Sequence, residues 1–322
     1  MKYLEKVEEV YKEAALNPQK GLCCTTTPIW QLPGLSIPTK MLEMNYGCGS
    51  TVHPRDLSNN PTVLYVGIGG GMELLQFSYF TRKISSVIGV DPVQEMITAC
   101  TQNLNEAEKH NDWFKKDFIK LYKGSALDLP LNDNSIDVAA QNCLFNIFHE
   151  NELVLALKEI YRVLKAHGRL VLSDPISEVE MPEKLKNDAN LRALCLSGAL
   201  PLKKYIELIS SIGFGTIEIR AKRPYRILDN LHYDIDENIF IESIEICAIK
   251  DQIPTDGACV FTGKTAIYYG SEELFDDNNG HMLLNNQPLA VCDKTAKALE
   301  SLNRNDVFIS GSTFFYDGGG CC

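Results

Sequence analysis

The sequence lacks three features that would each indicate a particular class of protein. Its longest stretch without charged residues, 21–39, is interrupted by Pro28, Pro33 and Pro38, which rules it out as a membrane-spanning helix. The first turns carry charges throughout and contain no apolar core, so they do not resemble a secretory signal peptide. Basic residues number 31 against 42 acidic ones, and a net charge of −11 disfavours nucleic-acid binding through a basic surface. These absences predict a cytoplasmic protein without a nucleic-acid or membrane partner.

A fourth absence concerns the spacing of the 11 cysteines. No CxxC pair occurs, so the common spacing of structural zinc sites is missing. Without an export signal, structural disulfides are also disfavoured. Two adjacent pairs, Cys23-Cys24 and Cys321-Cys322, point to thiol chemistry because packing rarely needs neighbouring thiols. We interpret four other cysteines as packing residues: Cys100, Cys247, Cys259 and Cys292.

Apolar runs alternate with helical patterns from residue 62 onwards. The predicted strands are 62–67, 86–91, 135–142, 168–174, 215–222 and 240–250. Two helices are predicted between them, 151–165 with Gly168 as its stop and 201–212 with Gly213 as its stop. Buried strands that alternate with helices predict an α/β fold with a parallel sheet covered on both faces.

The chain as a whole is expected to divide into three parts. Residues 1–57 are expected to form an amphipathic helix, with Leu4, Val7 and Tyr11 on one face, followed by substrate-side loops. Residues 58–251 are expected to form a Rossmann-like domain that carries an insert. Residues 252–322 are expected to form a small α+β domain that contains a short helix capped by Asp293 and ends in a Gly-Cys tail.

The first predicted strand runs into a glycine-rich turn that contains Gly67, Gly69 and Gly71. Glycines at such a turn let the backbone approach a bound ligand closely. The second strand ends in Asp91, whose carboxylate can accept hydrogen bonds from both hydroxyl groups of a ribose. Strand, glycines and acid together predict a site for a nucleoside-type cofactor.

The G-x-G-x-G spacing of this turn resembles the first motif of Rossmann-like methyltransferases, and residues 124–131 resemble their adenine loop. The resemblance implies a class I methyltransferase fold with S-adenosylmethionine as cofactor. One position departs from the pattern. Where the family has an acid two residues before the first glycine, this sequence has Tyr65, and Glu73 is the candidate to replace that acid.

Three cysteine segments make the resemblance more specific. AsnTyrGlyCysGly at 45–49 precedes the first strand, GlnAsnCysLeuPheAsnIle at 141–147 ends a later strand, and LeuCysLeuSerGlyAlaLeu at 194–200 precedes a helix. In this order they resemble arsenite S-adenosylmethionine methyltransferases. The pair Cys23-Cys24 and the C-terminal segments 265–270, 281–284 and 288–292 also resemble that family. The terminal GlyGlyGlyCysCys is similar to bacterial members linked to arsenosugar synthesis.

The resemblance implies a set of site residues. Trivalent arsenic is expected on Cys48, Cys143 and Cys195, with Cys23 and Cys24 delivering arsenite or exchanging electrons. The expected cofactor contacts are Tyr46, Gly67, Gly69, Gly71, Asp91, Pro92, Ser125, Ala126 and Asn142. The implied co-substrate is a thiol reductant, glutathione or thioredoxin, and a contact with thioredoxin is expected.

Elementary chemistry agrees with this assignment, because a soft trivalent arsenic selects thiolates and keeps a lone pair that can take a methyl group. The implied role is arsenite methylation in detoxification. Two alternatives remain open: a methyltransferase acting on another small molecule, and a module that binds arsenic or zinc on thiolates without turnover.

Overall fold

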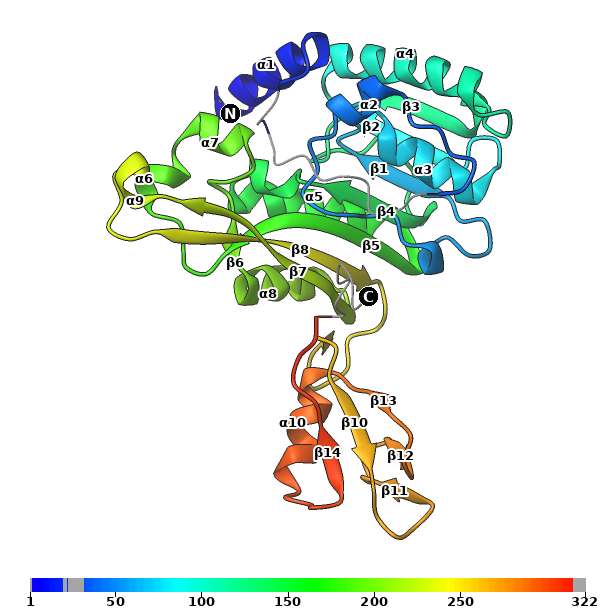
Figure 1. Ribbon diagram of the computed structural model, residues 1–322, viewed down its shortest axis with the longest axis vertical. Coiled ribbons are helices and arrows are strands. Elements are labelled where there is room, and N and C mark those ends of the chain that lie inside the picture. The colour runs from blue at the N-terminus through cyan, green and yellow to red at the C-terminus, as the bar shows by residue number, and fades with distance from the viewer. Residues whose placement is uncertain (1, 20–21, 23–31, 315–322) are drawn as a thin grey trace.

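The computed structural model describes residues 2–19, 22 and 32–314 (Figure 1). A nine-stranded sheet forms its centre, in the order β3-β2-β1-β4-β5-β8-β7-β9, with β6 paired to β5. The strands are β1 (Val63–Val66), β2 (Val87–Asp91), β3 (Ile119–Lys123), β4 (Ile136–Asn142), β5 (Leu164–Ser177), β6 (Leu200–Pro201), β7 (Thr216–Leu228), β8 (Ile239–Ile249) and β9 (Cys259–Phe261). β1, β2, β3, β4 and β5 run parallel, as the alternating pattern predicted.

Two hydrophobic cores lie on opposite faces of this sheet. In β1, Val63 and Tyr65 join one core, whereas Leu64 and Val66 join the other. The first core contains α3 (Met72–Thr81) and α4 (Gln94–His110), and the second contains α5 (Glu150–Val163) and α8 (Leu202–Ile212). Because successive side chains of a strand point to opposite faces, a strand buried on both faces must be apolar throughout.

Three details of the sheet differ from the sequence prediction. β8 runs antiparallel to both β5 and β7, because the short connection 229–238 is too brief for a crossover to a parallel strand. β3 was not predicted, since its sequence IKLYK is an edge strand largely exposed to solvent. Gly168 does not end the preceding helix. α5 ends at Val163, and Gly168 lies within β5, where a Cβ atom would stand 2.9 Å from the carbonyl oxygen of Lys165.

The N-terminal segment contains α1 (Lys2–Leu16), in agreement with the predicted amphipathic helix, and α2 (Thr39–Glu43). α1 packs against α4 and against α7 (Ala189–Ala193), and it lies across one end of the molecule (Figure 1). The remaining short helices are η1 (Pro54–Asp56), η2 (Lys116–Phe118), η3 (Phe145–Ile147), α6 (Glu183–Lys186) and α9 (Asn230–Tyr233). Within the described ranges, no helix combines the length and the apolar character needed to cross a membrane.

The C-terminal segment projects from the opposite side of the molecule (Figure 1). Its elements are β10 (Thr265–Tyr268), β11 (Leu274–Asp276), β12 (Met282–Leu284), β13 (Leu289–Ala290), α10 (Asp293–Ser301) and β14 (Val307–Ile309). They enclose a small core of their own around Tyr268, Leu283 and Leu299. The predicted cap of the helix was one residue off, since Cys292 is the N-cap and Asp293 lies in the first turn. β9 precedes this unit and pairs with β7 of the large sheet.

A buried ion cluster fastens the segment before β1 to the sheet. Asp56 of η1 accepts hydrogen bonds from Arg169 of β5 at 2.8 Å and from two nitrogens of Arg220 of β7. Burial by itself would raise the pKa of Asp56, but the hydrogen bonds and charges of the two arginines outweigh burial and hold the pKa below its ordinary value. The ionised carboxylate therefore stabilises the fold above about pH 4, and this contribution is lost as the pH falls through the lower pKa of the folded state.

Replacement of Asp56 by Asn tests this cluster. Asp56→Asn removes the buried carboxylate that Arg169 and Arg220 share and leaves the buried Arg220 with only the partly exposed Glu218, so the free energy of unfolding is expected to fall by about 3 kcal/mol. Urea denaturation measures the change. The matched control is Asp117→Asn, because Asp117 is exposed and its replacement should change stability by less than about 0.5 kcal/mol. Equal stability of the two variants would contradict a structural role for the cluster.

Candidate functional site

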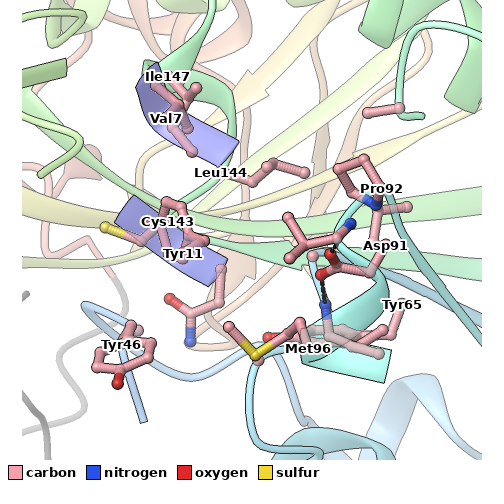
Figure 2. A pocket seen from close by; sticks show the side chains of 18 of the residues that line it. Val7, Tyr11, Tyr46, Tyr65, Asp91, Pro92, Met96, Cys143, Leu144 and Ile147 are labelled. Carbon is pink, nitrogen blue, oxygen red and sulfur yellow. Dashed lines mark hydrogen bonds between the residues drawn. The ribbon is translucent and has the colours of Figure 1, made fainter. Parts of the chain in front are cut away.

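A pocket opens at the carboxyl ends of β1, β2 and β4, the edge at which parallel α/β sheets bind ligands (Figure 2). The turn 67–70, residues 91–93 after β2, residues 125–126 and residues 142–144 after β4 form its walls. Three separate strand ends therefore supply the lining, and the parallel sheet brings them together.

The glycine-rich turn adopts the conformation that its residue type allows. Gly67, Gly69 and Gly71 all have positive φ, at 77°, 50° and 89°. Gly67 and Gly69 line the pocket together with Gly70. Gly71 is placed differently, outside the lining at the start of α3, where a Cβ atom would stand 2.7 Å from the sulfur of Cys100. Its geometry serves the packing of α3 against α4.

Asp91 lies at the pocket wall with both carboxylate oxygens engaged by backbone groups (Figure 2). Oδ2 accepts from the amide of Ile68 at 3.0 Å, and Oδ1 accepts from the amide of Val93 at 2.9 Å. Burial raises the pKa of Asp91 to about 6, although these two amides favour the charged form. A carboxylate offers about four lone-pair positions, so each oxygen can accept one more hydrogen bond from a ligand.

The other predicted cofactor contacts also lie in this lining: Tyr46, Pro92, Ser125, Ala126 and Asn142. Tyr46 reaches it from the loop before β1, and its hydroxyl donates to the carbonyl of Ala14 in α1 at 3.4 Å.

The sequence prediction missed the part of the lining that α1 supplies. Leu4, Val7 and Tyr11, the apolar face of that helix, line the pocket. Figure 2 shows Val7 and Tyr11 across the pocket from Pro92 and Asp91. The hydroxyl of Tyr11 donates to the carbonyl of Ala193 in α7 at 3.1 Å, which anchors the helix there. The amphipathic pattern showed that this face would be buried, but not that it would cover a ligand site.

A polar network joins the pocket to the first cysteine segment. Asn142 accepts from the amide of Cys48 at 2.9 Å and donates to Glu73 of α3 at 3.0 Å. Glu73 also makes a side-chain hydrogen bond with Tyr65, the residue that replaces the family's acid. Burial raises the pKa of Glu73 above its ordinary value, and the bonds with Asn142 and Tyr65 offset only part of this rise. The carboxylate that the sequence lacks on β1 is thus present in the pocket on α3.

The three predicted arsenic ligands converge on the ends of β4 and β5, and all three are buried. Cys143 lines the pocket, and Cys48 and Cys195 do not (Figure 2). The Cys195 thiol donates to the carbonyl of Cys143. The Cys48 sulfur lies 3.3 Å from the hydroxyl of Ser173, whose carbonyl accepts from the amide of Cys143 at 2.7 Å. Ser173 and the carbonyl of Cys143 therefore connect the three cysteines.

The thiols do not already form a metal cage. Among the described residues, no group of three or more His, Cys, Asp or Glu side chains is positioned to hold a metal ion. Cys23 and Cys24, like Cys321 and Cys322, fall outside the described residues. The structure therefore brings Cys48, Cys143 and Cys195 close to one another, but their three sulfur atoms are not arranged to bind one atom.

The backbone around Cys143 is unusual and firmly held. Cys143 has φ +61° and Cys195 has φ +58°, a region that non-glycine residues rarely occupy. Gln141 accepts from the amide of Leu144 at 2.8 Å and donates to the buried carboxylate of Asp174. The hydroxyl of Tyr205 donates to the same carboxylate at 2.7 Å. This network keeps the strained turn in place.

The segment around Cys48 is held from the other side by β8. The hydroxyl of Ser243 donates to the carbonyl of Cys48 at 2.7 Å. Glu245 accepts from the amide of Ser50 at 2.6 Å and from Arg223 at 2.9 Å. Burial would raise the pKa of Glu245, but a hydrogen bond with His53, the charge of Arg223 and the Ser50 amide outweigh it and lower the pKa. The charged carboxylate therefore fixes this loop.

Comparison with known proteins shows which proteins this chain is similar to. Residues 64–172 match the family described as methyltransferase domain. The chain is 26% identical to the arsenite methyltransferase of Aquipseudomonas alcaligenes over 308 residues, which cover 92% of this chain and 87% of that protein. The human arsenite methyltransferase is 30% identical over 171 residues, which cover 52% of this chain and 44% of that protein. The alignment thus spans less than half the length of the human relative.

The fold is shared with a solved structure of an arsenic (III) S-adenosylmethionine methyltransferase from Chlamydomonas reinhardtii. The TM-score is 0.62 at 23% identity, with 89% of this chain and 96% of the other covered. The class I methyltransferase fold that the sequence predicted is therefore confirmed, and so is the resemblance to arsenite methyltransferases.

The donor set of the pocket fits S-adenosylmethionine. Asp91 retains a lone pair on each oxygen for the two ribose hydroxyls. Apolar atoms of Pro92, Met96 and Ala126 line the same pocket and suit an adenine ring. Glu73 also lines the pocket, and its carboxyl group suits the positive charge of an amino group.

The pKa of Asp91 makes cofactor affinity dependent on pH. At pH 7 the carboxyl group is ionised and can accept hydrogen bonds from a ribose, and below a pKa of about 6 it is protonated. Loss of these charged hydrogen bonds costs on the order of 1–3 kcal/mol, so calorimetry is expected to show S-adenosylmethionine binding weakened about tenfold at pH 5. Asp91→Asn is the control and should bind weakly at both pH values. Equal affinity of the wild-type protein at pH 7 and pH 5 would remove Asp91 from the ribose site.

Proposed function

We propose that this chain, a relative of the arsenite methyltransferases, transfers the methyl group of S-adenosylmethionine to trivalent arsenic held by the thiolates of Cys48, Cys143 and Cys195. One observation carries the proposal. Cys143 follows directly on Asn142 at the end of β4, so that a cysteine and the polar contacts of the cofactor pocket share one wall. Cys48 and Cys195 approach this cysteine from two loops.

The residue types suit this substrate. Thiolates are the ligands that a soft, thiophilic centre prefers, and three of them leave the lone pair of trivalent arsenic free. S-adenosylmethionine supplies the electrophilic methyl group for that lone pair. Because arsenic carries no proton that must be removed, the chain needs no acid–base pair at the reacting atom. Its contribution is to orient the thiols and to exclude water with the apolar face of α1.

Substrate binding closes the three thiols onto one atom. The Cys195 thiol leaves the carbonyl of Cys143, and the Cys48 sulfur leaves the hydroxyl of Ser173. The positions of the two loops change little. Asn142 and Ser243 hold the Cys48 backbone through its amide and its carbonyl, and Asn146 donates to the carbonyl of Cys195. Rotation of side chains about fixed backbones is therefore sufficient.

The pair Cys23-Cys24 and an external thiol complete the proposed cycle. The N-terminal pair delivers arsenite to the site or exchanges electrons with its cysteines. Glutathione or thioredoxin serves as the reductant, and thioredoxin makes a contact with the chain for this purpose.

Single Cys→Ser substitutions test the thiolate site. Cys48→Ser, Cys143→Ser and Cys195→Ser are each expected to abolish methylation of arsenite, because serine offers a hard, protonated oxygen in place of a soft thiolate. The assay follows labelled methyl groups from S-adenosylmethionine in the presence of a thiol. Calorimetry should show cofactor binding retained, which demonstrates that each variant is folded. Cys247→Ser is the matched control, since Cys247 is buried in β8 and should tolerate the change. Full activity of Cys143→Ser would refute the site.

The two adjacent pairs are expected to differ in their effects. The double change Cys23→Ser and Cys24→Ser should strongly impair methylation of arsenite. It should impair methylation of a monomethylated trivalent arsenical less, since that substrate needs only two thiolates. Deletion of 318–322 is the comparison and should leave turnover at saturating arsenite nearly intact, because the proposed site consists of Cys48, Cys143 and Cys195 and does not include Cys321 or Cys322. The measurement is the initial rate of methylation as a function of arsenite concentration for both variants. If the deletion loses turnover at saturating arsenite while the Cys23/Cys24 variant keeps it, the roles assigned to the two cysteine pairs are reversed.

A further inference from the structure

Two cysteines of the C-terminal segment approach each other from different elements. Cys259 stands in β9, and Cys292 is the N-cap residue of α10. Their side chains interact, and the ammonium group of Lys294 contacts Cys259 as well. Cys292 is buried, whereas Cys259 is partly exposed and can be reached from solvent. The pair therefore differs from the fully buried Cys100 and Cys247.

The backbone on both sides of this pair is fixed. The amide of Cys259 donates to the carbonyl of Gly215 at 2.8 Å, which ties β9 to the large sheet. The hydroxyl of Thr262 donates to Asp293 at 2.7 Å and so fastens the start of α10 to the end of β9. Lys294 donates to the carbonyl of Gly257 at 2.7 Å. These contacts hold the two thiols side by side before any ligand arrives.

A chain of polar groups leads away from Cys292. Its sulfur lies 3.2 Å from the hydroxyl of Thr295, which lies 3.2 Å from Nε2 of His281. Nδ1 of that histidine lies 2.7 Å from Asp277. With the proton of the neutral ring on Nδ1, facing the carboxylate, Nε2 accepts from Thr295 and Thr295 accepts from the thiol. The thiol proton of Cys292 thus has a route to an imidazole whose positive charge Asp277 balances.

We infer that Cys259 and Cys292 form a second thiol site, which binds trivalent arsenicals that carry one carbon substituent. Such a compound, RAs(OH)₂, has two exchangeable hydroxyl groups. Each thiol forms one As–S bond, and each departing hydroxide leaves with a thiol proton as water, so arsenic keeps its oxidation state. Two-thiol ligation matches the geometry, because the described residues contain no group of three candidate ligands here.

One nearby charge, that of Lys294, reduces the cost of forming a thiolate in this partly buried pair. Burial and the neighbouring thiol of Cys292 raise the pKa of Cys259, and Lys294 acts in the opposite direction. The ammonium group of Lys294 beside Cys259, and the start of α10 at Cys292, therefore offset part of the cost of burying a thiolate. The choice of arsenic as the ligand rests on the proposed function, since the first methylation yields a compound of this class. The juxtaposition of the two thiols does not depend on it.

Protection from alkylation tests the site in the full-length chain. The protein is incubated with phenylarsine oxide, a monosubstituted trivalent arsenical, then treated with N-ethylmaleimide, and the labelling of Cys259 is quantified by peptide mass spectrometry. Cys259 is expected to be protected in the wild-type chain. In Cys292→Ser, the concentration for half-protection should rise on the order of 100-fold, because the arsenical then has one thiol instead of two. Cys247→Ser is the matched control and should behave as wild type.

A variant with Cys48, Cys143 and Cys195 all changed to Ser separates this inference from the proposed function. It should lack methylation but still protect Cys259, and retained S-adenosylmethionine binding reports its folding. An unprotected Cys259 in the wild-type chain would overturn the inference, as would equal protection in Cys292→Ser. Either result would leave the arsenite site at β4 and β5 standing, whereas methylation by the triple variant would refute that site alone.

Discussion

The side chain of Asn142 holds together the two halves of the site. It donates to the carbonyl of Gly49 at 2.9 Å, donates to Glu73, and accepts from the amide of Cys48. These bonds join β4, α3 and the loop before β1 at one residue, which also lines the pocket. The loop also packs tightly against this side chain, because a Cβ atom on Gly47 would stand 2.3 Å from the side-chain amide nitrogen of Asn142. A close, fully bonded contact thus positions the Cys48 segment against the cofactor pocket.

The strained turn at Cys143 depends on the same region. A non-glycine residue at positive φ costs of order 1–3 kcal/mol and persists only where its surroundings determine it. Here Gln141 bonds the next amide and is itself bonded to Asp174, which Tyr205 also contacts. The strand therefore turns sharply at its end, and Cys143 lines the pocket from there. Strain at this point is consistent with a functional residue and is offset by the buried network.

Charged groups in the interior serve to place loops. Asp56 lies within the segment that connects Cys48 to β1, and Glu245 of β8 accepts from the Ser50 amide of the same segment. Each of the two carboxylates is paired with arginine. The two arginines outweigh the effect of burial on the pKa of Asp56, and His53, Arg223 and the Ser50 amide together outweigh it at Glu245, so both carboxylates stay ionised. Asp91 has no such counter-charge, and burial dominates its pKa. A lowered pKa thus marks the two carboxylates that stabilise the fold, Asp56 and Glu245, and a raised pKa marks Asp91, which lines the ligand pocket.

Much of the α/β framework could be predicted from the sequence, because strand burial, the glycine turn and the acid at the end of β2 depend on local periodicity and on residue type. The resemblance of three cysteine segments likewise predicted that Cys48, Cys143 and Cys195 belong together. Contacts between distant segments left no local pattern. Only the tertiary structure showed that α1 lines the pocket and that β8 runs antiparallel to its neighbours. It also showed the hydrogen bond between Glu73 and Tyr65 and the contact between Cys259 and Cys292. Such pairings are decided by how elements pack in three dimensions, and residue order along the chain does not encode that packing in any single segment.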